Sequence, residues 1–305
     1  MHGDKNGGKK GRVHMETWLI FAILASLFAG VNAVLAKVGI SGVNSHLATA
    51  IRTVVIVIFS WIVVFSFGSQ AGLSDVDGRT WFFLVASGLS TGASWLCFFY
   101  ALKYGTVSGV SPLKKSSTVL TIILAFLVLG ETVGLPQIGG MVFIIVGTVL
   151  MINFKSATGQ SESGGKNWLV FGILAAVFAS LTTIFGAIGI ADVDANLGNA
   201  IRVVVVLIAS WGMVFLTGNQ KGTFKIGKKN LLFLALSGLA TGGSWLFFFH
   251  ALQSGPVSVI VPIDKLSIIL NILFAYIFLK EKQSRKSLAG LACLAIGTLL
   301  LVVRL

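Results

Sequence analysis

The amino-acid sequence contains two copies of one unit, and the copies are offset by 150 residues without a gap (168 − 18 = 150). Residues 91–102 (TGASWLCFFYAL) and residues 241–252 (TGGSWLFFFHAL) are nearly identical. A repeat of this length predicts two similar structural units in one chain. The matched positions that define the offset are Trp18 with Trp168, Arg52 with Arg202, Trp61 with Trp211, Trp95 with Trp245, and Glu131 with Glu281.

Each copy consists mainly of apolar runs long enough for membrane helices. Hydrophobic residues make up 55% of the chain and charged residues only 11%, whereas about a quarter of the residues in soluble proteins are charged. The sequence therefore predicts an all-α integral membrane protein with ten transmembrane helices. The runs are residues 18–36, 47–67, 81–102, 107–129 and 138–152, then 168–188, 197–216, 231–252, 257–279 and 288–303.

Five spans per copy have a topological consequence. Because five is odd, the second copy enters the membrane from the opposite side, which predicts two inverted five-helix repeats. We expect a flexible basic tail or an added extension over residues 1–14, a first repeat over 15–154, a Ser/Gly-rich linker over 155–166 and a second repeat over 167–305.

The formal net charge of +13 does not indicate nucleic-acid binding, because the Lys and Arg residues lie mainly in short loops between apolar runs. Cys97 and Cys293 lie inside apolar runs without a CxxC or His pairing, so neither a disulfide nor a metal site is predicted. The sequence contains no phosphate-binding GxxxxGK[ST] loop and no Ser/His pairing or carboxylate pair at usable spacing. We therefore expect neither an enzyme nor a bound cofactor.

The motifs resemble those of a known family. Each unit resembles an EamA domain of the drug/metabolite transporter superfamily, and the resemblance extends from Met15 to Leu305. It implies a ten-helix secondary transporter, and specifically an exporter, that moves a small organic metabolite or drug-like solute between its halves by alternating access. The residues that carry the resemblance are Pro112, Glu131, Gly140 and Gly147, their equivalents Pro262, Glu281, Gly290 and Gly297, and Arg52 and Arg202.

Two polar stripes indicate where a solute would bind. Asp264, Ser267 and Asn271 are spaced i, i+3 and i+7, so they share one face of a helix. The equivalent positions in the first repeat are Lys114, Ser117 and Thr121. We expect the two stripes to meet across a central cavity. The Lys114/Asp264 difference gives that cavity a preference for one sign of charge.

Two interpretations of Asp264 remain open. Asp264 binds a cationic group or a coupling proton, which would make protons the coupling ion. Alternatively, an ion pair with Lys114 or Lys265 only ties helices together. Lys115 and Lys265 recur in both copies, and they either contact an anionic part of the substrate or extend to lipid headgroups.

The aromatic residues Trp95, Tyr100, Trp245 and His250 suit an amphipathic solute, and interhelical packing is the alternative. For Arg52 and Arg202 we favour a structural bond to the other half or to lipid phosphate over substrate contact. Glu131 and Glu281 are interpreted as caps or inter-loop pairs.

The expected partners are a small-molecule substrate and the lipid bilayer, and the expected location is the plasma membrane. Transport by exchange and a passive channel or scaffold are the alternatives to proton coupling. The family resemblance places both termini in the cytosol, but the distribution of Lys and Arg favours the opposite orientation. Six such residues lie on the side of the termini (Lys5, Lys9, Lys10, Arg12, Arg79, Arg304) and ten on the other (Lys155, Lys166, Lys221, Lys225, Lys228, Lys229, Lys280, Lys282, Arg285, Lys286).

Overall fold

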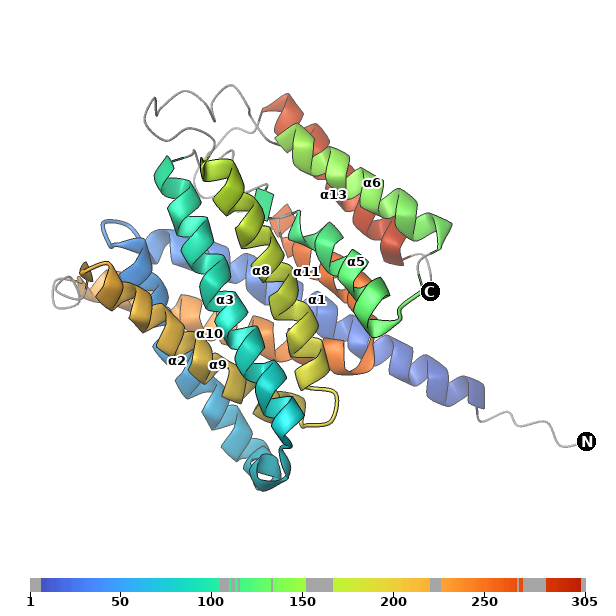
Figure 1. The fold of residues 1–305 in the computed structure, drawn as a ribbon, viewed down its shortest axis with the longest axis horizontal. Helices are drawn as coiled ribbons and strands as arrows, with labels where there is room; N and C mark the ends of the chain where they lie inside the picture. Colours follow the sequence, from blue (N-terminus) through green and yellow to red (C-terminus); the bar gives the residue numbers. More distant parts are fainter. Residues whose placement is uncertain are drawn as a thin grey trace, which may run out of the picture.

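The computed structural model describes residues 7–104, 110, 113–114, 116–132, 134–151, 167–219, 226–267, 269–270 and 284–302. Over this part the chain is helical and contains no strand (Figure 1). The first repeat contains α1 (Gly7–Gly39), α2 (Ser45–Phe67), η1 (Ser69–Asp75), α3 (Gly78–Tyr104), α5 (Ser117–Leu129) and α6 (Leu135–Met151). The second contains α8 (Asn167–Gly189), α9 (Ala195–Leu216), α10 (Lys228–Ser254), α11 (Val257–Lys265) and α13 (Arg285–Val302).

Six helices within the described residues are long and apolar enough to cross a membrane. Three shorter apolar helices, Ser117–Leu129, Leu135–Leu150 and Leu288–Leu301, accompany them. Large apolar side chains such as Phe65, Phe67 and Leu135 are exposed on the outside of the bundle, as expected for a surface that faces lipid. The prediction of a multi-pass, all-helical membrane protein is confirmed, and ten spans stay a prediction. The six long segments are Thr17–Gly39, Ser45–Phe67, Gly78–Leu102, Asn167–Gly189, Ala195–Leu216 and Lys228–Ser254.

The boundaries of the expected domains are not tested by this helix pattern. Helix α1 begins at Gly7, within the segment 1–14 that we expected to be flexible. The expected linker, residues 155–166, lies outside the described residues. The division into tail, repeats and linker therefore stays a prediction.

Equivalent helix starts in the two repeats use equivalent caps. The Asn44 side chain accepts hydrogen bonds from the backbone N–H groups at the start of α2, at 2.9 and 3.4 Å. The Asp194 side chain does the same at the start of α9, at 3.0 and 3.2 Å. Both residues satisfy N–H groups that have no partner within the helix. The local structure is thus repeated even where the residue type differs.

The helices of the two repeats pair crosswise. Helix α1 packs on α10, and its equivalent α8 packs on α3, the equivalent of α10. The Ser94 hydroxyl on α3 donates to the carbonyl of Ala175 at 2.8 Å, and the Ser244 hydroxyl on α10 donates to the carbonyl of Ala25 at 2.9 Å. These matched contacts relate the repeats by an approximate two-fold axis.

Helices α6 and α13 cross at glycines and lie together at one side of the bundle (Figure 1). A Cβ atom on Gly140 would lie 2.7 Å from the carbonyl oxygen of Gly297, and one on Gly147 would lie 2.6 Å from that of Gly290. Gly140 is the repeat equivalent of Gly290, and Gly147 is that of Gly297. The earlier glycine of α6, Gly140, therefore meets the later glycine of α13, Gly297, and Gly147 meets Gly290. This reversed order shows that the two helices run antiparallel. Small residues allow this close approach of the backbones.

Glu131, just after α5, links the two repeats. Its carboxylate accepts hydrogen bonds from the backbone N–H groups of Val257 and Ser258, at 2.6 and 3.0 Å. These groups begin α11, where an anion is favoured by the helix dipole. The interpretation of Glu131 as a cap is therefore confirmed, while Glu281 lies outside the described residues.

Candidate functional site

A cavity of about 220 Å³ lies where the two repeats meet. Its walls come from α1, α3, α8, α9, α10 and α11, together with Lys114. Equivalent residues of both repeats line it, so it lies on the approximate two-fold axis. The matched lining pairs are Ala29 with Ala179, Thr91 with Thr241, Ser94 with Ser244 and Trp95 with Trp245, together with two dissimilar pairs, Asn32 with Thr182 and Lys114 with Asp264.

Two tryptophans form an aromatic wall of the cavity. The rings of Trp95 and Trp245 stack with their centroids 6.5 Å apart and their planes inclined by 28°. Because the two residues are repeat equivalents on α3 and α10, the two-fold relationship brings them together. Phe248 and Phe249 extend the wall. Such a surface offers apolar contact to a solute, and ring faces to a planar or cationic group.

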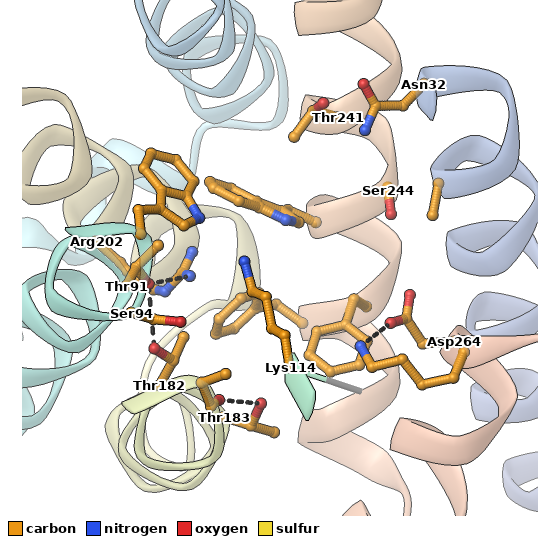
Figure 2. A pocket seen from close by; sticks show the side chains of 17 residues that line it. Asn32, Thr91, Ser94, Lys114, Thr182, Thr183, Arg202, Thr241, Ser244 and Asp264 are labelled. Atoms are coloured by element: carbon orange, nitrogen blue, oxygen red, sulfur yellow. Dashed lines mark hydrogen bonds and ion pairs between the residues drawn. The ribbon is translucent and has the colours of Figure 1, made fainter. Parts of the chain in front are cut away.

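Arg202 on α9 places a guanidinium against this aromatic wall. The Arg202 side chain is only 3% exposed, and its Cζ atom lies 4.7 Å from the ring centroid of Trp245 and 4.8 Å from that of Phe249. Its Nε donates to the Ser87 hydroxyl at 3.0 Å. Its Nη2 donates to the Thr91 hydroxyl, also at 3.0 Å (Figure 2). Nη1 has no hydrogen-bond partner among the described residues. A buried donor without a partner is costly.

The equivalent arginine of the first repeat does not line the cavity. Arg52 donates through Nη2 to the Asn32 side-chain oxygen at 2.7 Å and to the Thr241 hydroxyl at 2.8 Å. Asn32 also accepts from the Ser237 hydroxyl at 2.7 Å. The equivalent of Asn32 is Thr182, whose hydroxyl lies 3.3 Å from that of Thr91. The Asn32/Thr182 difference thus accompanies a change of partner: Arg52 donates to Asn32, whereas Arg202 donates to Ser87 and lines the cavity.

Lys114 extends into the middle of the cavity, between Arg202 on one side and Asp264 on the other (Figure 2). Its Nζ lies 4.6 Å from the ring centroid of Phe98, a cation–π contact. Asp264 is paired with its neighbour, since Lys265 Nζ lies 2.7 Å from Asp264 Oδ2. The Lys265 side chain is 42% exposed and that of Asp264 is 16% exposed.

The described lining residues therefore give the cavity a positive charge. Three cationic side chains, Lys114, Arg202 and Lys265, face one carboxylate, that of Asp264, so the formal sum is 3 − 1 = +2. Two of these cations, Lys114 and Arg202, have no carboxylate within ion-pair distance in the part of the chain that the structure describes. The arrangement attracts an anion more than a cation.

The structure gathers five of the residues expected from the sequence around the cavity: Trp95, Trp245, Lys114, Asp264 and Lys265. Ser117 and Thr121 are buried on α5 instead, and the Thr121 hydroxyl donates to the Ser117 carbonyl at 2.8 Å. Ser267 is described but is not among the lining residues. Lys115 and Asn271 lie outside the described residues.

Tyr100 and His250 lie away from the lining, in equivalent environments. The Tyr100 ring packs on Phe171 with centroids 4.2 Å apart, and His250 packs on Phe21, the equivalent of Phe171, at 5.4 Å. His250 Nε2 also lies 2.8 Å from the Asn196 side-chain oxygen. Each side chain thus contacts a neighbouring helix, although Tyr100 is 41% exposed.

Sequence reasoning missed Asn32 and Thr182, and it favoured a structural role for Arg202. A signal for these residues was available, because the two copies differ at position 32/182 as they do at 114/264. A systematic comparison of the copies would have drawn attention to both differences.

The chain matches a family model described as "EamA-like transporter family" twice, over residues 16–153 and 166–303. An uncharacterized transporter of Sinorhizobium sp. is 45% identical over 139 residues, which are 46% of this chain and 99% of that protein. An uncharacterized protein of Methanocaldococcus jannaschii is 28% identical over 137 residues, 45% of this chain and 97% of that protein. Both relatives are therefore about as long as one repeat.

The fold also matches a solved structure. A crystal structure of another protein superposes with a TM-score of 0.78 at 17% sequence identity, covering 94% of this chain and 96% of that one. At this identity the likeness shows the fold alone.

Proposed function

Because the chain belongs to the EamA-like transporter family, we propose that it is a secondary transporter that carries a small organic solute through the central cavity by alternating access. In this proposal ten helices span the membrane as two inverted five-helix repeats. Rocking of one half against the other opens the cavity to each side in turn. The transport direction we propose is export across the plasma membrane, as the family resemblance implies.

The observation that carries the proposal is a polar, charged cavity at the interface of the two repeats. A buried cation such as Arg202, and a half-buried one such as Lys114, is costly inside an apolar helical bundle. Their presence beside Thr91, Ser94 and their equivalents is accounted for if the cavity holds a solute and water during transport. Helix packing alone would be served better by apolar side chains.

The cavity volume supports a metabolite over a drug-sized molecule. Pockets for drug-sized ligands have volumes of about 300–1,000 Å³, whereas this cavity measures about 220 Å³. A solute that fits without rearrangement is correspondingly small.

Asp264 is our candidate for the coupling proton, and exchange of solutes is the alternative form of coupling. Protonation of Asp264 would break its ion pair with Lys265, which is 2.7 Å long. The loss of this pair would free Lys265 and change the charge of the cavity. A proton could thereby alter solute affinity on one side of the membrane.

The test is flux into proteoliposomes that contain the purified protein and a panel of radiolabelled organic acids, amines and neutral metabolites. A transporter gives saturable uptake of at least one solute above that of protein-free vesicles. An imposed pH gradient should drive this uptake in the parent protein and not in Asp264→Asn. Lys229→Met, at an exposed position of α10, is the control for a surface charge.

Three outcomes are distinct. If the flux saturates and does not depend on the pH gradient, but increases when solute is present on the opposite side of the membrane, the mechanism is exchange instead of proton coupling. Flux that does not saturate would assign a passive channel. An absence of flux for every solute class would contradict transport and leave a scaffold as the function.

A further inference from the structure

We propose that the cavity binds a small organic carboxylate, with the carboxylate beside Lys114 and Arg202 and an apolar, planar body against the tryptophan wall. This proposal rests on the proposed function, since it names the class of solute that the same cavity takes. Three features of the cavity support it: its charge balance, the geometry of Arg202 and the aromatic surface beside Arg202.

The charge balance favours an anionic solute. Asp264 is already paired with Lys265 at 2.7 Å, so its charge is largely compensated. Lys114 and Arg202 face the same cavity of about 220 Å³ without a carboxylate of their own among the described residues. Like charges repel strongly where water is scarce. An anion placed between the two side chains offsets this repulsion.

The geometry of Arg202 favours a group with two acceptor oxygens. Hydrogen bonds from Nε to Ser87 and from Nη2 to Thr91 fix the guanidinium plane. The remaining nitrogen, Nη1, lacks an acceptor among the residues that the structure describes. A carboxylate oxygen supplies that acceptor, and the second oxygen is free to accept from Lys114. Charge-assisted bonds of this kind are the strong ones in proteins.

The aromatic wall sets the rest of the solute. Trp245 contacts Arg202 on one side and stacks on Trp95 on the other, so apolar surface begins next to the cationic group. A planar body attached to the carboxylate can lie on these rings. The small volume limits that body to about the size of one ring.

The same features disfavour a cationic solute. Its charge would face Lys114 and Arg202, and the carboxylate available to it, Asp264, would first have to release Lys265. Each of these steps costs electrostatic free energy. A neutral solute meets no such cost, but it leaves the charge of Lys114 and Arg202 uncompensated.

The test compares three ring compounds of nearly equal shape that differ in charge. Benzoate, benzamide and benzylamine are titrated into the full-length protein in detergent at low chloride, and binding is followed by isothermal calorimetry and by the shift in melting temperature. Benzoate should bind and raise the melting temperature, and the other two should not. Lys114→Met should weaken benzoate binding about tenfold or more, the range expected for the loss of one charge-assisted hydrogen bond. Lys229→Met, which removes an exposed lysine, should leave it unchanged.

A second variant guards against a folding defect in Lys114→Met. Arg202→Lys keeps the charge but loses the planar donor pair, so benzoate binding should weaken. The melting temperature without ligand, measured for both variants, shows whether each one is still folded. Benzamide or benzylamine binding as tightly as benzoate overturns the carboxylate proposal. Transport of an amine or a neutral solute in the proteoliposome assay would then leave the proposed function intact.

Binding of benzoate that survives Lys114→Met and Arg202→Lys also overturns the proposal, because the carboxylate would then lie elsewhere. The titrations extend to about 10 mM, which is high enough to detect a dissociation constant of roughly 1 mM. If none of the three compounds binds at this concentration, the carboxylate class is rejected. If the proteoliposome assay then shows flux of another solute class, only the carboxylate proposal fails and the assignment as a transporter stands.

Discussion

Arg52 and Arg202 occupy equivalent positions in the two repeats, yet only Arg202 lines the central cavity. Arg52 donates to Asn32 at 2.7 Å, whereas the position equivalent to Asn32 in the second repeat is Thr182. The amide oxygen of Asn32 also accepts from Ser237, whereas Arg202 donates directly to Ser87, the equivalent of Ser237. The cavity of this two-fold scaffold is therefore asymmetric at the 32/182 pair as well as at the Lys114/Asp264 pair.

We expect Asn32→Ala to destabilise the protein by about 1–3 kcal/mol, because two part-buried donors, on Arg52 and Ser237, lose their acceptor. The matched control is Thr182→Ala in the other repeat. Thr182 makes a longer contact to Thr91, 3.3 Å, and also bonds its own helix, so its loss should cost less. Thermal unfolding in detergent measures both. If Asn32→Ala and Thr182→Ala lose the same amount of stability, the hydrogen bonds of Asn32 do not stabilise the protein more than those of Thr182.

The crossing of α6 and α13 gives a prediction with a control one residue away. A Cβ atom on Gly140 would lie 2.7 Å from the Gly297 carbonyl oxygen, whereas one on Gly139 meets nothing within 4 Å. Gly140→Ala should therefore force the helices apart and cost about 1–3 kcal/mol, as overpacking usually does. Gly139→Ala should be neutral or slightly stabilising, because alanine is the better helix former. Melting temperatures that fall by the same amount in both variants would contradict the close crossing.

Glu131 should contribute to stability through α11, although it lies in the other repeat. Glu131→Ala removes the acceptor of two backbone N–H groups, and losing a helix cap typically costs about 0.5–2 kcal/mol. Glu131→Gln keeps one side-chain oxygen and should lose less. Hydrogen exchange at Val257 and Ser258, followed by mass spectrometry of the peptide that contains them, checks the site of the effect. Faster exchange elsewhere without a change there would rule out the capping role.

The repeat made much of the fold predictable from the sequence. An offset of 150 residues and the apolar runs were sufficient to predict two helical units. In the site, the charge difference between Lys114 and Asp264 pointed to the cavity. The position of Arg202 was not predictable, because it depends on the acceptors that α3 presents to it in space, Ser87 and Thr91. Tyr100 and His250 were placed in the cavity because they share an aromatic segment with Trp95 and Trp245, but they lie about one turn further along their helices and on another face.

A pH dependence is expected at the start of α3, just before the membrane-spanning segment that begins at Gly78. Hydrogen bonds from the side chain and the backbone of Thr80 lower the pKa of the Asp77 carboxyl, and the Thr80 N–H lies 2.8 Å from Asp77 Oδ1. Because the pKa of the folded state lies below that of the unfolded state, the ionised cap contributes its full stabilisation above the unfolded pKa of about 3.9. The contribution is lost as the pH falls through the lowered pKa of the folded state.

Asp77→Asn isolates this contribution, because asparagine also caps helices but does not titrate. The melting temperature of the parent protein should exceed that of Asp77→Asn at neutral pH, where the carboxylate is favoured by the helix N-terminus. The difference should shrink once the pH falls below the unfolded pKa, because the carboxyl then becomes neutral. Unfolding scans of both proteins in the same detergent, from neutral pH down to the acid limit of the fold, measure it. A difference that stays constant over this range would show that Asp77 does not stabilise α3 through its charge.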